Sequence, residues 1–205
     1  MAEHDEDKET TPSTAEPRNA FLEEKAFKSR TVLVFGEISD RSAADIVRRL
    51  VALDADSNMP INMLVSSPGG HLESGDAIHD MLRFISAPVN MIGTGWVGSA
   101  ATHMYLAVPK ERRYCTPNTR FLIHQPSGGA GGQAADIAIA AREILRWRTT
   151  LNETIARHTG KTPDQVEKDS DRDYYMSAQE AKDYGIVDHV VVSTRDAQTA
   201  VQSAA

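Results

Sequence analysis

Gly95-Trp-Val-Gly-Ser-Ala-Ala101 follows a short apolar run at residues 89–92 and leads into a second apolar run that ends at residue 107. The first run has the length and composition of a strand, and the second those of a short helix. In parallel α/β sheets, functional groups gather where a strand ends and the chain turns into a helix. The stretch therefore predicts an α/β fold with a functional site close to Ser99.

The rest of the chain alternates strand and helix signals in the same way. Strands are predicted at residues 31–35, 61–65, 114–123 and 186–192, and helices at 42–53, 77–85 and 133–158, with two further helices starting at Thr162 and Ser177. Gly160 and Gly185 are placed to end helices, because glycine readily adopts the left-handed backbone of a helix C-terminus. This alternation predicts an α/β domain with a mostly parallel sheet.

Composition indicates one globular domain. The chain has 205 residues, of which 40% are hydrophobic, enough for a sizeable core. Residues 1–19 are polar and acidic, and we expect them to form a disordered tail. The folded domain is predicted at residues 20–195, followed by a flexible C-terminal tail at 196–205.

Several classes of protein are disfavoured. A net charge of −7 argues against nucleic acid as a partner. The single cysteine, Cys115, allows no internal disulfide and no cysteine-based zinc cluster. We find no H-E-x-x-H, G-x-G-x-x-G or P-loop pattern, so we expect no metal and no cofactor. The apolar runs are too short to cross a membrane, and the acidic N-terminus is unlike a secretory signal. We expect a cytoplasmic protein.

Ser99 is the candidate nucleophile. A serine hydroxyl attacks a carbonyl only when a neighbouring base takes its proton. Small neighbours at Gly98 and Ala100 would admit a substrate, and a strand-to-helix turn exposes the side chain. A serine in this position also suits a helix N-cap. The local sequence alone leaves both roles open.

Two histidines are candidates for the base. His124 ends the apolar run Phe121-Leu-Ile123, and His103 lies one helical turn after Ser99. A carboxylate would hold the imidazole in the useful tautomer. Asp173 is a candidate because it ends the acidic run 169–173 beside two tyrosines, although such runs are usually solvated surface.

The turn Pro68-Gly69-Gly70 could supply an oxyanion hole. Glycine allows backbone N–H groups to approach a ligand closely, as stabilisation of a developing oxyanion requires. A plain tight turn is the alternative.

Taken together, these segments resemble the proteolytic subunit of the Clp protease family, ClpP. The matching motifs occur in family order: Phe35-Gly-Glu-Ile38, Ser67-Pro-Gly-Gly70, Gly95 to Ala101, and residues 117–126, 131–137, 141–145, 158–160, 171–173 and 180–188. They span residues 30 to 190, essentially the whole globular part.

The resemblance implies a crotonase-like ββα superhelix with a protruding strand-helix handle made from residues 125–132 and the long helix after them. It implies a Ser99, His124 and Asp173 triad, with the backbone N–H groups of Gly70 and Ala100 as the oxyanion hole. The implied activity is that of a serine endopeptidase that degrades unfolded polypeptides to short peptides.

The resemblance also implies an assembly. Heptameric rings would stack into a tetradecamer around a closed chamber, fed by a Clp-family ATPase. Arg172 matches a family position that pairs across the rings.

Two alternatives stay open. The bulky Trp96 and the Gly98-Ser99-Ala100 flank depart from the family pattern, which would suit a weakly active or non-catalytic subunit of a hetero-oligomeric ring. Asn62 and Leu64 stand where the family often has tyrosines that receive the ATPase. A crotonase-type acyl-CoA enzyme would share the fold, but would carry acids where this chain has Ser99 and His124.

Overall fold

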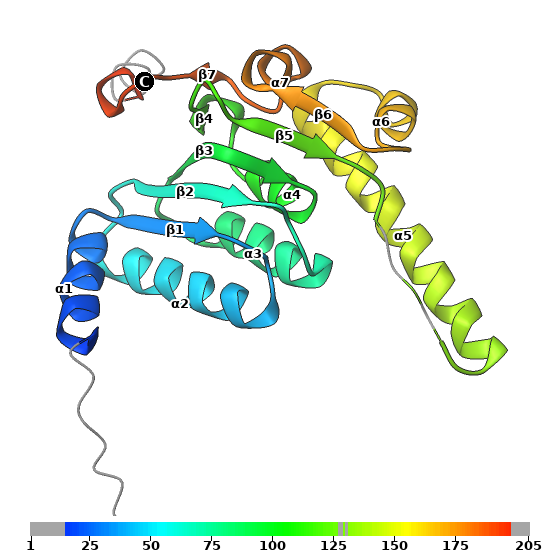
Figure 1. Ribbon diagram of the computed structural model, residues 1–205, viewed down its shortest axis with the longest axis horizontal. Coiled ribbons are helices and arrows are strands. Elements are labelled where there is room, and N and C mark those ends of the chain that lie inside the picture. Colours follow the sequence, from blue (N-terminus) through cyan, green and yellow to red (C-terminus); the bar gives the residue numbers. More distant parts are fainter. Residues whose placement is uncertain (1–14, 127–128, 130, 198–205) are drawn as a thin grey trace, which may run out of the picture.

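The computed structural model describes residues 15–126, 129 and 131–197, and Figure 1 shows their arrangement. The helices are α1 (Ala15–Lys28), α2 (Asp40–Asp56), α3 (Leu72–Phe84), α4 (Ala100–Tyr105), α5 (Ala134–Thr159), α6 (Pro163–Asp169) and α7 (Ala178–Tyr184), with a 3₁₀ turn η1 (Lys110–Arg112). The strands are β1 (Thr31–Phe35), β2 (Ile61–Ser67), β3 (Val89–Gly98), β4 (Arg113–Cys115), β5 (Arg120–Ile123), β6 (Tyr174–Ser177) and β7 (His189–Val190).

The sheet is mostly parallel, as the sequence predicts. Strands β1, β2 and β3 lie side by side and run in one direction. The long strand β3 then pairs with β4 through Met91–Gly93 and with β5 through Trp96–Gly98. Only β6, which pairs with β5, runs antiparallel among the described strands. The sheet therefore divides at β3, whose first half pairs with β4 and whose second half pairs with β5. Strands β5 and β6 thus lie beside the end of β3, where Ser99 follows.

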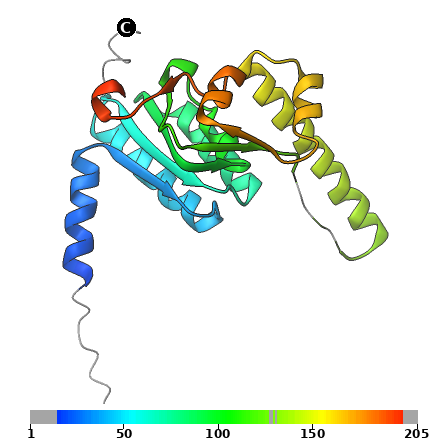
Figure 2. The same cartoon turned by 45° about the horizontal axis from the view of Figure 1, so that its top comes forward.

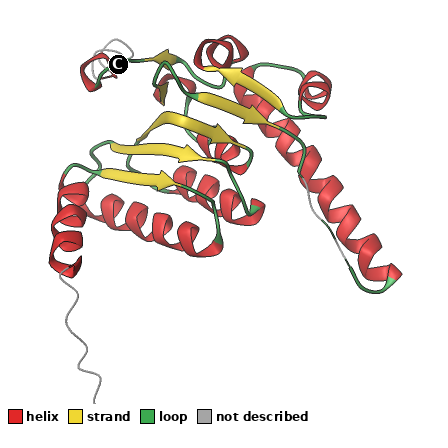
Figure 3. Ribbon diagram, viewed as in Figure 1, coloured by secondary structure: helices red, strands yellow, loops and turns green. Residues whose placement is uncertain are grey.

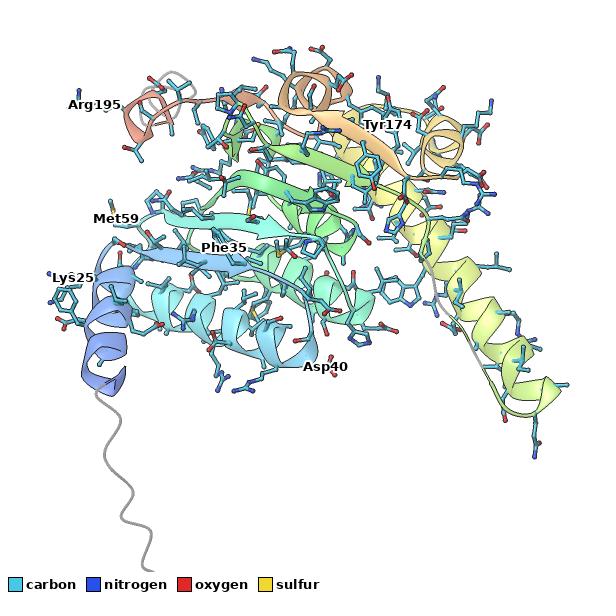
Figure 4. The ribbon with its side chains drawn as sticks, in the orientation of Figure 1. Lys25, Phe35, Asp40, Met59, Tyr174 and Arg195 are labelled. Atoms are coloured by element: carbon cyan, nitrogen blue, oxygen red, sulfur yellow. The ribbon has the colours of Figure 1, made fainter. Side chains whose placement is uncertain are left out.

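Helices α2 and α3 cover one face of the first three strands (Figure 3). Along β2, Ile61, Met63 and Val65 are fully buried, while the residues between them are partly exposed. Side chains of a strand alternate between faces, so one face of β2 packs on the helices. On β1 the opposite face carries the exposed side chains of Leu33 and Phe35, the latter labelled in Figure 4.

Helix α5 protrudes from the body of the domain, as Figures 1 and 2 show. Its C-terminal part packs into the core through residues such as Leu151 and Ile155. Toward its N-terminus, Ile137, Ile139 and Leu145 are largely exposed. Part of the connector before it, residues 127–128 and 130, lies outside the described residues.

Several predicted boundaries are wrong in detail. Helix α2 begins at Asp40 because Ser39, not Ser42, is the N-cap of a Ser39–Ser42 capping box. The extended run 114–123 is two strands with a turn between them, and β7 spans only His189–Val190. The prediction that Gly160 and Gly185 end helices is confirmed, because both glycines are helix C-caps with left-handed backbone conformation.

The predicted N-terminal tail overlaps a helix. Helix α1 begins at Ala15, inside the segment 1–19 that we expected to be disordered, and residues 1–14 lie outside the described residues. The predicted boundary at 195–196 falls within a short helical segment at 194–197, and residues 198–205 of the expected C-terminal tail lie outside the described residues. In the part of the chain that is described, no helix is long and apolar enough to span a membrane.

Arg113 joins the loop after α4 to the ends of two helices in the core. Its side chain is almost fully buried, and its guanidinium reaches the carbonyl oxygens of Val108, His158 and Gly185 at 2.9, 3.3 and 3.3 Å. The last two carbonyls belong to the C-terminal ends of α5 and α7. Carbonyl groups at a helix C-terminus have no hydrogen-bond donor within their own helix, so Arg113 supplies one. Burial lowers the pKa of Arg113 to about 10, so the group stays charged at neutral pH.

His158, which contacts Arg113, is neutral at neutral pH. Burial first, and then the charge of Arg113, lower the pKa of His158 to about 4. The imidazole is therefore neutral at neutral pH, and its Nδ1 can accept a hydrogen bond from Arg113 at 3.4 Å.

We predict that Arg113→Leu lowers the free energy of unfolding by at least about 3 kcal/mol, because several buried carbonyls lose their donor together. Urea unfolding followed by circular dichroism at one fixed protein concentration measures this change. Arg48→Leu is the control, since Arg48 is an exposed side chain on α2 and its loss should change the free energy by less than about 0.5 kcal/mol. Equal effects of the two substitutions would contradict the role given to Arg113.

Candidate active site

Ser99 has an unusual backbone that suits a nucleophile. It lies between β3 and α4 with φ 54° and ψ −124°, and Arg30 is the only other described non-glycine residue with positive φ. Such a conformation is strained for an L-residue and persists only when its surroundings impose it. The hydroxyl makes no capping hydrogen bond to α4, so the N-cap role that the sequence left open is not what occupies this side chain.

The strained turn is held from both sides. The Ser99 N–H donates to the carbonyl of Leu122 at 3.0 Å, which continues the β3–β5 pairing past the end of the strand. The buried hydroxyl of Thr102 lies 3.0 Å from the Val97 carbonyl oxygen and 2.9 Å from that of Leu122. These contacts fix the first turn of α4 against both strands.

Glycines leave room for this turn. A Cβ atom at Gly69 would lie 2.7 Å from the Ser99 Cβ and 2.9 Å from the Ala100 nitrogen. At Gly70, where φ is 145°, a Cβ atom would collide with the Ile38 carbonyl oxygen. The Gly69–Gly70 backbone is also tied to the chain after β1, because Ile38 N–H donates to the Gly69 carbonyl at 2.8 Å.

Strand pairing brings His124 and Asp173 together. Ile123 on β5 lies opposite Tyr174 on β6, and Tyr174 is labelled in Figure 4. In an antiparallel pair, the next two residues that face each other are then His124 and Asp173. The His124 Nδ1 and the Asp173 Oδ1 are 3.4 Å apart. The Asp173 carboxylate also accepts a hydrogen bond of 3.3 Å from the Tyr175 hydroxyl.

Four of the predicted site residues line one cavity. Gly70, Ser99, Ala100 and His124 all face a space of about 550 Å³. Asp173 is behind His124, on the strand that supports the histidine. The structure thus brings the predicted triad and oxyanion residues to one place, and the catalytic role of each residue stays a prediction.

Helix α5 supplies an apolar wall of the cavity that the sequence analysis missed. The wall is made by Ile144, Trp147, Leu151 and Ile155. Their spacing of three and four residues is the signal of one helix face. The sequence shows this spacing, but it does not show that the face borders a cavity.

Trp96 does not line this cavity. Its ring packs edge-on against Tyr175, with 5.7 Å between ring centroids, and lies beside Gly98. The departure from the family pattern at this position is therefore accommodated outside the cavity that Ser99 faces.

His103, the other candidate base, is engaged elsewhere. Its Nε2 lies 3.1 Å from Asp76 Oδ1, and its ring stacks on His79 with centroids 4.5 Å apart. Burial, followed by the effect of His79, lowers the pKa of His103. His103 also borders the cavity, but its Nε2 pairs with Asp76 and its ring stacks on His79 in the buried contact between α3 and α4, whereas His124 pairs with Asp173 across β5 and β6.

Comparison with known proteins decides the family. A profile of the Clp protease family matches residues 14–194. The chain belongs to this family. It is 50% identical over 196 residues to ATP-dependent Clp protease proteolytic subunit 3 of Rhizobium johnstonii, covering 96% of this chain and 100% of that one. It is 54% identical over 177 residues to proteolytic subunit 2 of Gluconobacter oxydans, covering 85% of this chain and 79% of that one.

Solved structures agree. A mutant of ClpP1 from Listeria monocytogenes superimposes with a TM-score of 0.80 at 46% sequence identity, covering 86% of this chain and 98% of that chain. The fold is therefore the ClpP fold, and the chain is a serine peptidase subunit of the Clp protease family. The acyl-CoA alternative is not favoured.

We predict that Gly69→Ala lowers kcat by 10² to 10³, roughly the cost of losing one oxyanion donor, because the added methyl group pushes Ser99 and Ala100 away from Gly70. A fluorogenic peptide assay on the purified assembly measures the loss. Gly160→Asn is the matched control, since it is a left-handed position with nothing within 4 Å of a Cβ atom, where asparagine is tolerated. Full activity in Gly69→Ala would show that the close contact is not needed.

Proposed function

We propose that this chain is the subunit in which Ser99 cuts unfolded polypeptides into short peptides inside a ring-shaped chamber. The observation that carries the proposal is the strained Ser99 facing one cavity with His124, which Asp173 contacts from behind. Such an arrangement supplies a nucleophile, a base and a group that orients the base.

The proposed chemistry uses each of these groups. With Nδ1–H of His124 directed at Asp173, Nε2 carries the lone pair that would accept the Ser99 proton as the hydroxyl oxygen attacks the scissile carbonyl. The N–H of Ala100 is the first of its helix and lacks an acceptor inside it, and with Gly70 it would stabilise the oxyanion. His124 then protonates the leaving amine, and water hydrolyses the acyl-enzyme by the same steps in reverse.

The cavity wall indicates a preference for apolar residues beside the cleaved bond. Ile144, Trp147 and Leu151 of α5 line the same cavity as Ser99. Burial of an apolar substrate side chain there would contribute binding energy roughly in proportion to its area.

We predict that Ser99→Ala abolishes peptidase activity and that Asp173→Asn lowers kcat by about 10⁴, the cost of the same change in another serine protease triad. A fluorogenic peptide assay measures both. Labelling by a fluorophosphonate probe separates the two variants, because Asp173→Asn keeps the nucleophile and should label slowly, while Ser99→Ala should not label. Near-normal activity in Ser99→Ala would refute the proposal.

The proposal includes assembly into two stacked heptameric rings and delivery of substrate by a Clp-family ATPase. The exposed apolar residues of α5, Ile137, Ile139 and Leu145, favour a partner for this helix. The names of the relatives, ATP-dependent Clp protease proteolytic subunits, favour an ATPase. We place the assembly in the cytoplasm, on the charge and lone cysteine of the chain.

Arg172 is positioned to couple assembly to the triad. Its side chain is 92% exposed and lies 4.0 Å from Asp171, while Asp173 is its immediate neighbour. A partner that holds Arg172 would order the short segment that positions Asp173.

We predict that Arg172→Ala converts tetradecamers to heptamers and lowers peptidase activity at least tenfold, since Asp173 loses its support from across the rings. Native mass measurement and the peptide assay on the same fraction test this. Arg48→Ala, a change of the same charge on the distant helix α2, should leave both unchanged. A fully active single ring would contradict the proposed coupling.

A further inference from the structure

A cluster of two histidines and an aspartate lies between α3 and α4, beside the cavity but outside the triad. Asp76 and His79 belong to α3, and His103 belongs to α4. Each offers one ligand atom, and the three atoms lie within 4.8 Å of one another. In a tetrahedral zinc site, bonds of about 2.0–2.1 Å place ligand atoms roughly 3.3 Å apart. His103 Nε2 and Asp76 Oδ1 are already 3.1 Å apart.

One histidine of this cluster has a ring nitrogen that is free to bind an ion. His79 and His103 are 8% and 3% exposed. The His79 Nε2 is buried and has no hydrogen-bond partner among the described residues, and His103 would bind through Nε2, the atom that already lies beside Asp76. A buried polar atom without a partner costs free energy, and neutral imidazole nitrogens are common metal ligands.

A carboxylate stands behind one histidine, as in many metal sites. Asp80 Oδ1 lies 3.4 Å from His79 Nδ1, which leaves Nε2 of that ring as the free donor of a lone pair. Metal-binding histidines usually give their other N–H to a carboxylate or carbonyl, which fixes the tautomer and orients the ring. Asp80 itself is largely exposed and is not needed for packing.

We propose that Asp76, His79 and His103 bind a divalent transition metal of the zinc class, which clamps α3 to α4. Imidazole with one carboxylate suits zinc and its first-row neighbours rather than magnesium or calcium. The histidine rings, now stacked, turn about χ2 to converge on the ion, and this torsion is soft. Asp76 is partly exposed and His103 borders the cavity, so the ion and one water ligand have access.

The clamp would act close to the proposed oxyanion hole. Helix α3 begins two residues after Gly70, and α4 begins at Ala100. The two helices touch where a Cβ atom at Gly75 would lie 3.0 Å from the Ala100 Cβ. The proposal concerns metal binding alone and stands or falls independently of peptide hydrolysis.

Calorimetric titration of Zn²⁺ into the chelator-treated wild-type assembly tests the proposal. We expect one Zn²⁺ per subunit with a Kd on the order of 1 µM or lower, and a melting temperature that rises with Zn²⁺ because the ion binds only the folded state. No saturable binding below about 100 µM would overturn the proposal.

Three variants locate the ion. His79→Phe should abolish saturable binding, and Asp80→Asn, an exposed change that leaves the core intact, should weaken binding by about 10–100-fold. His71→Asn is the control, because His71 lies 2.9 Å from Asp40 and 3.1 Å from Glu73 in the other histidine–carboxylate cluster near the cavity. Wild-type affinity in Asp80→Asn, or loss of binding in His71→Asn, would overturn the assignment even if His79→Phe failed to fold.

Discussion

The close approach of the Gly69–Gly70 backbone to Ser99 is the constraint on which the site depends. A side chain at Gly69 would overlap Ser99 and the nitrogen of Ala100, and one at Gly70 would overlap the chain after β1. The ends of β1, β2 and β3 are therefore packed backbone against backbone. Because the strands are parallel, their carboxyl ends meet at one edge of the sheet, and the strain at Ser99 is supported by contacts from both neighbouring strands.

The part of the site that lies at these strand ends could be predicted from the sequence. Pro68-Gly69-Gly70 and Gly98-Ser99-Ala100 are local signals, since glycine marks a close approach and a serine after a strand marks an exposed turn. The ordered family motifs then favoured His124 over His103. The acid was harder to place from the residues alone, because the pairing of β6 with β5 is non-local and residues 169–173 read as a solvated charge run.

Features made by contacts between helices could not be predicted from local pattern. The spacing of Ile144, Trp147 and Leu151 shows that α5 has an apolar face, but not that the face borders a cavity beside Ser99. In the same way, Asp76 and His79 share a face of α3, whereas the approach of His103 depends on how α4 packs against it. A search for sequence motifs cannot find the Asp76, His79 and His103 cluster, because its residues come from two separate helices.

Helix α5 contributes to two different surfaces of the molecule. It forms the apolar wall of the cavity through Trp147, and it extends Ile137, Ile139 and Leu145 into the surroundings. A contact made at the protruding end would act on the same helix that forms the wall. Under the proposed assembly, the shape of the cavity beside Ser99 would therefore depend on what the exposed end of α5 contacts.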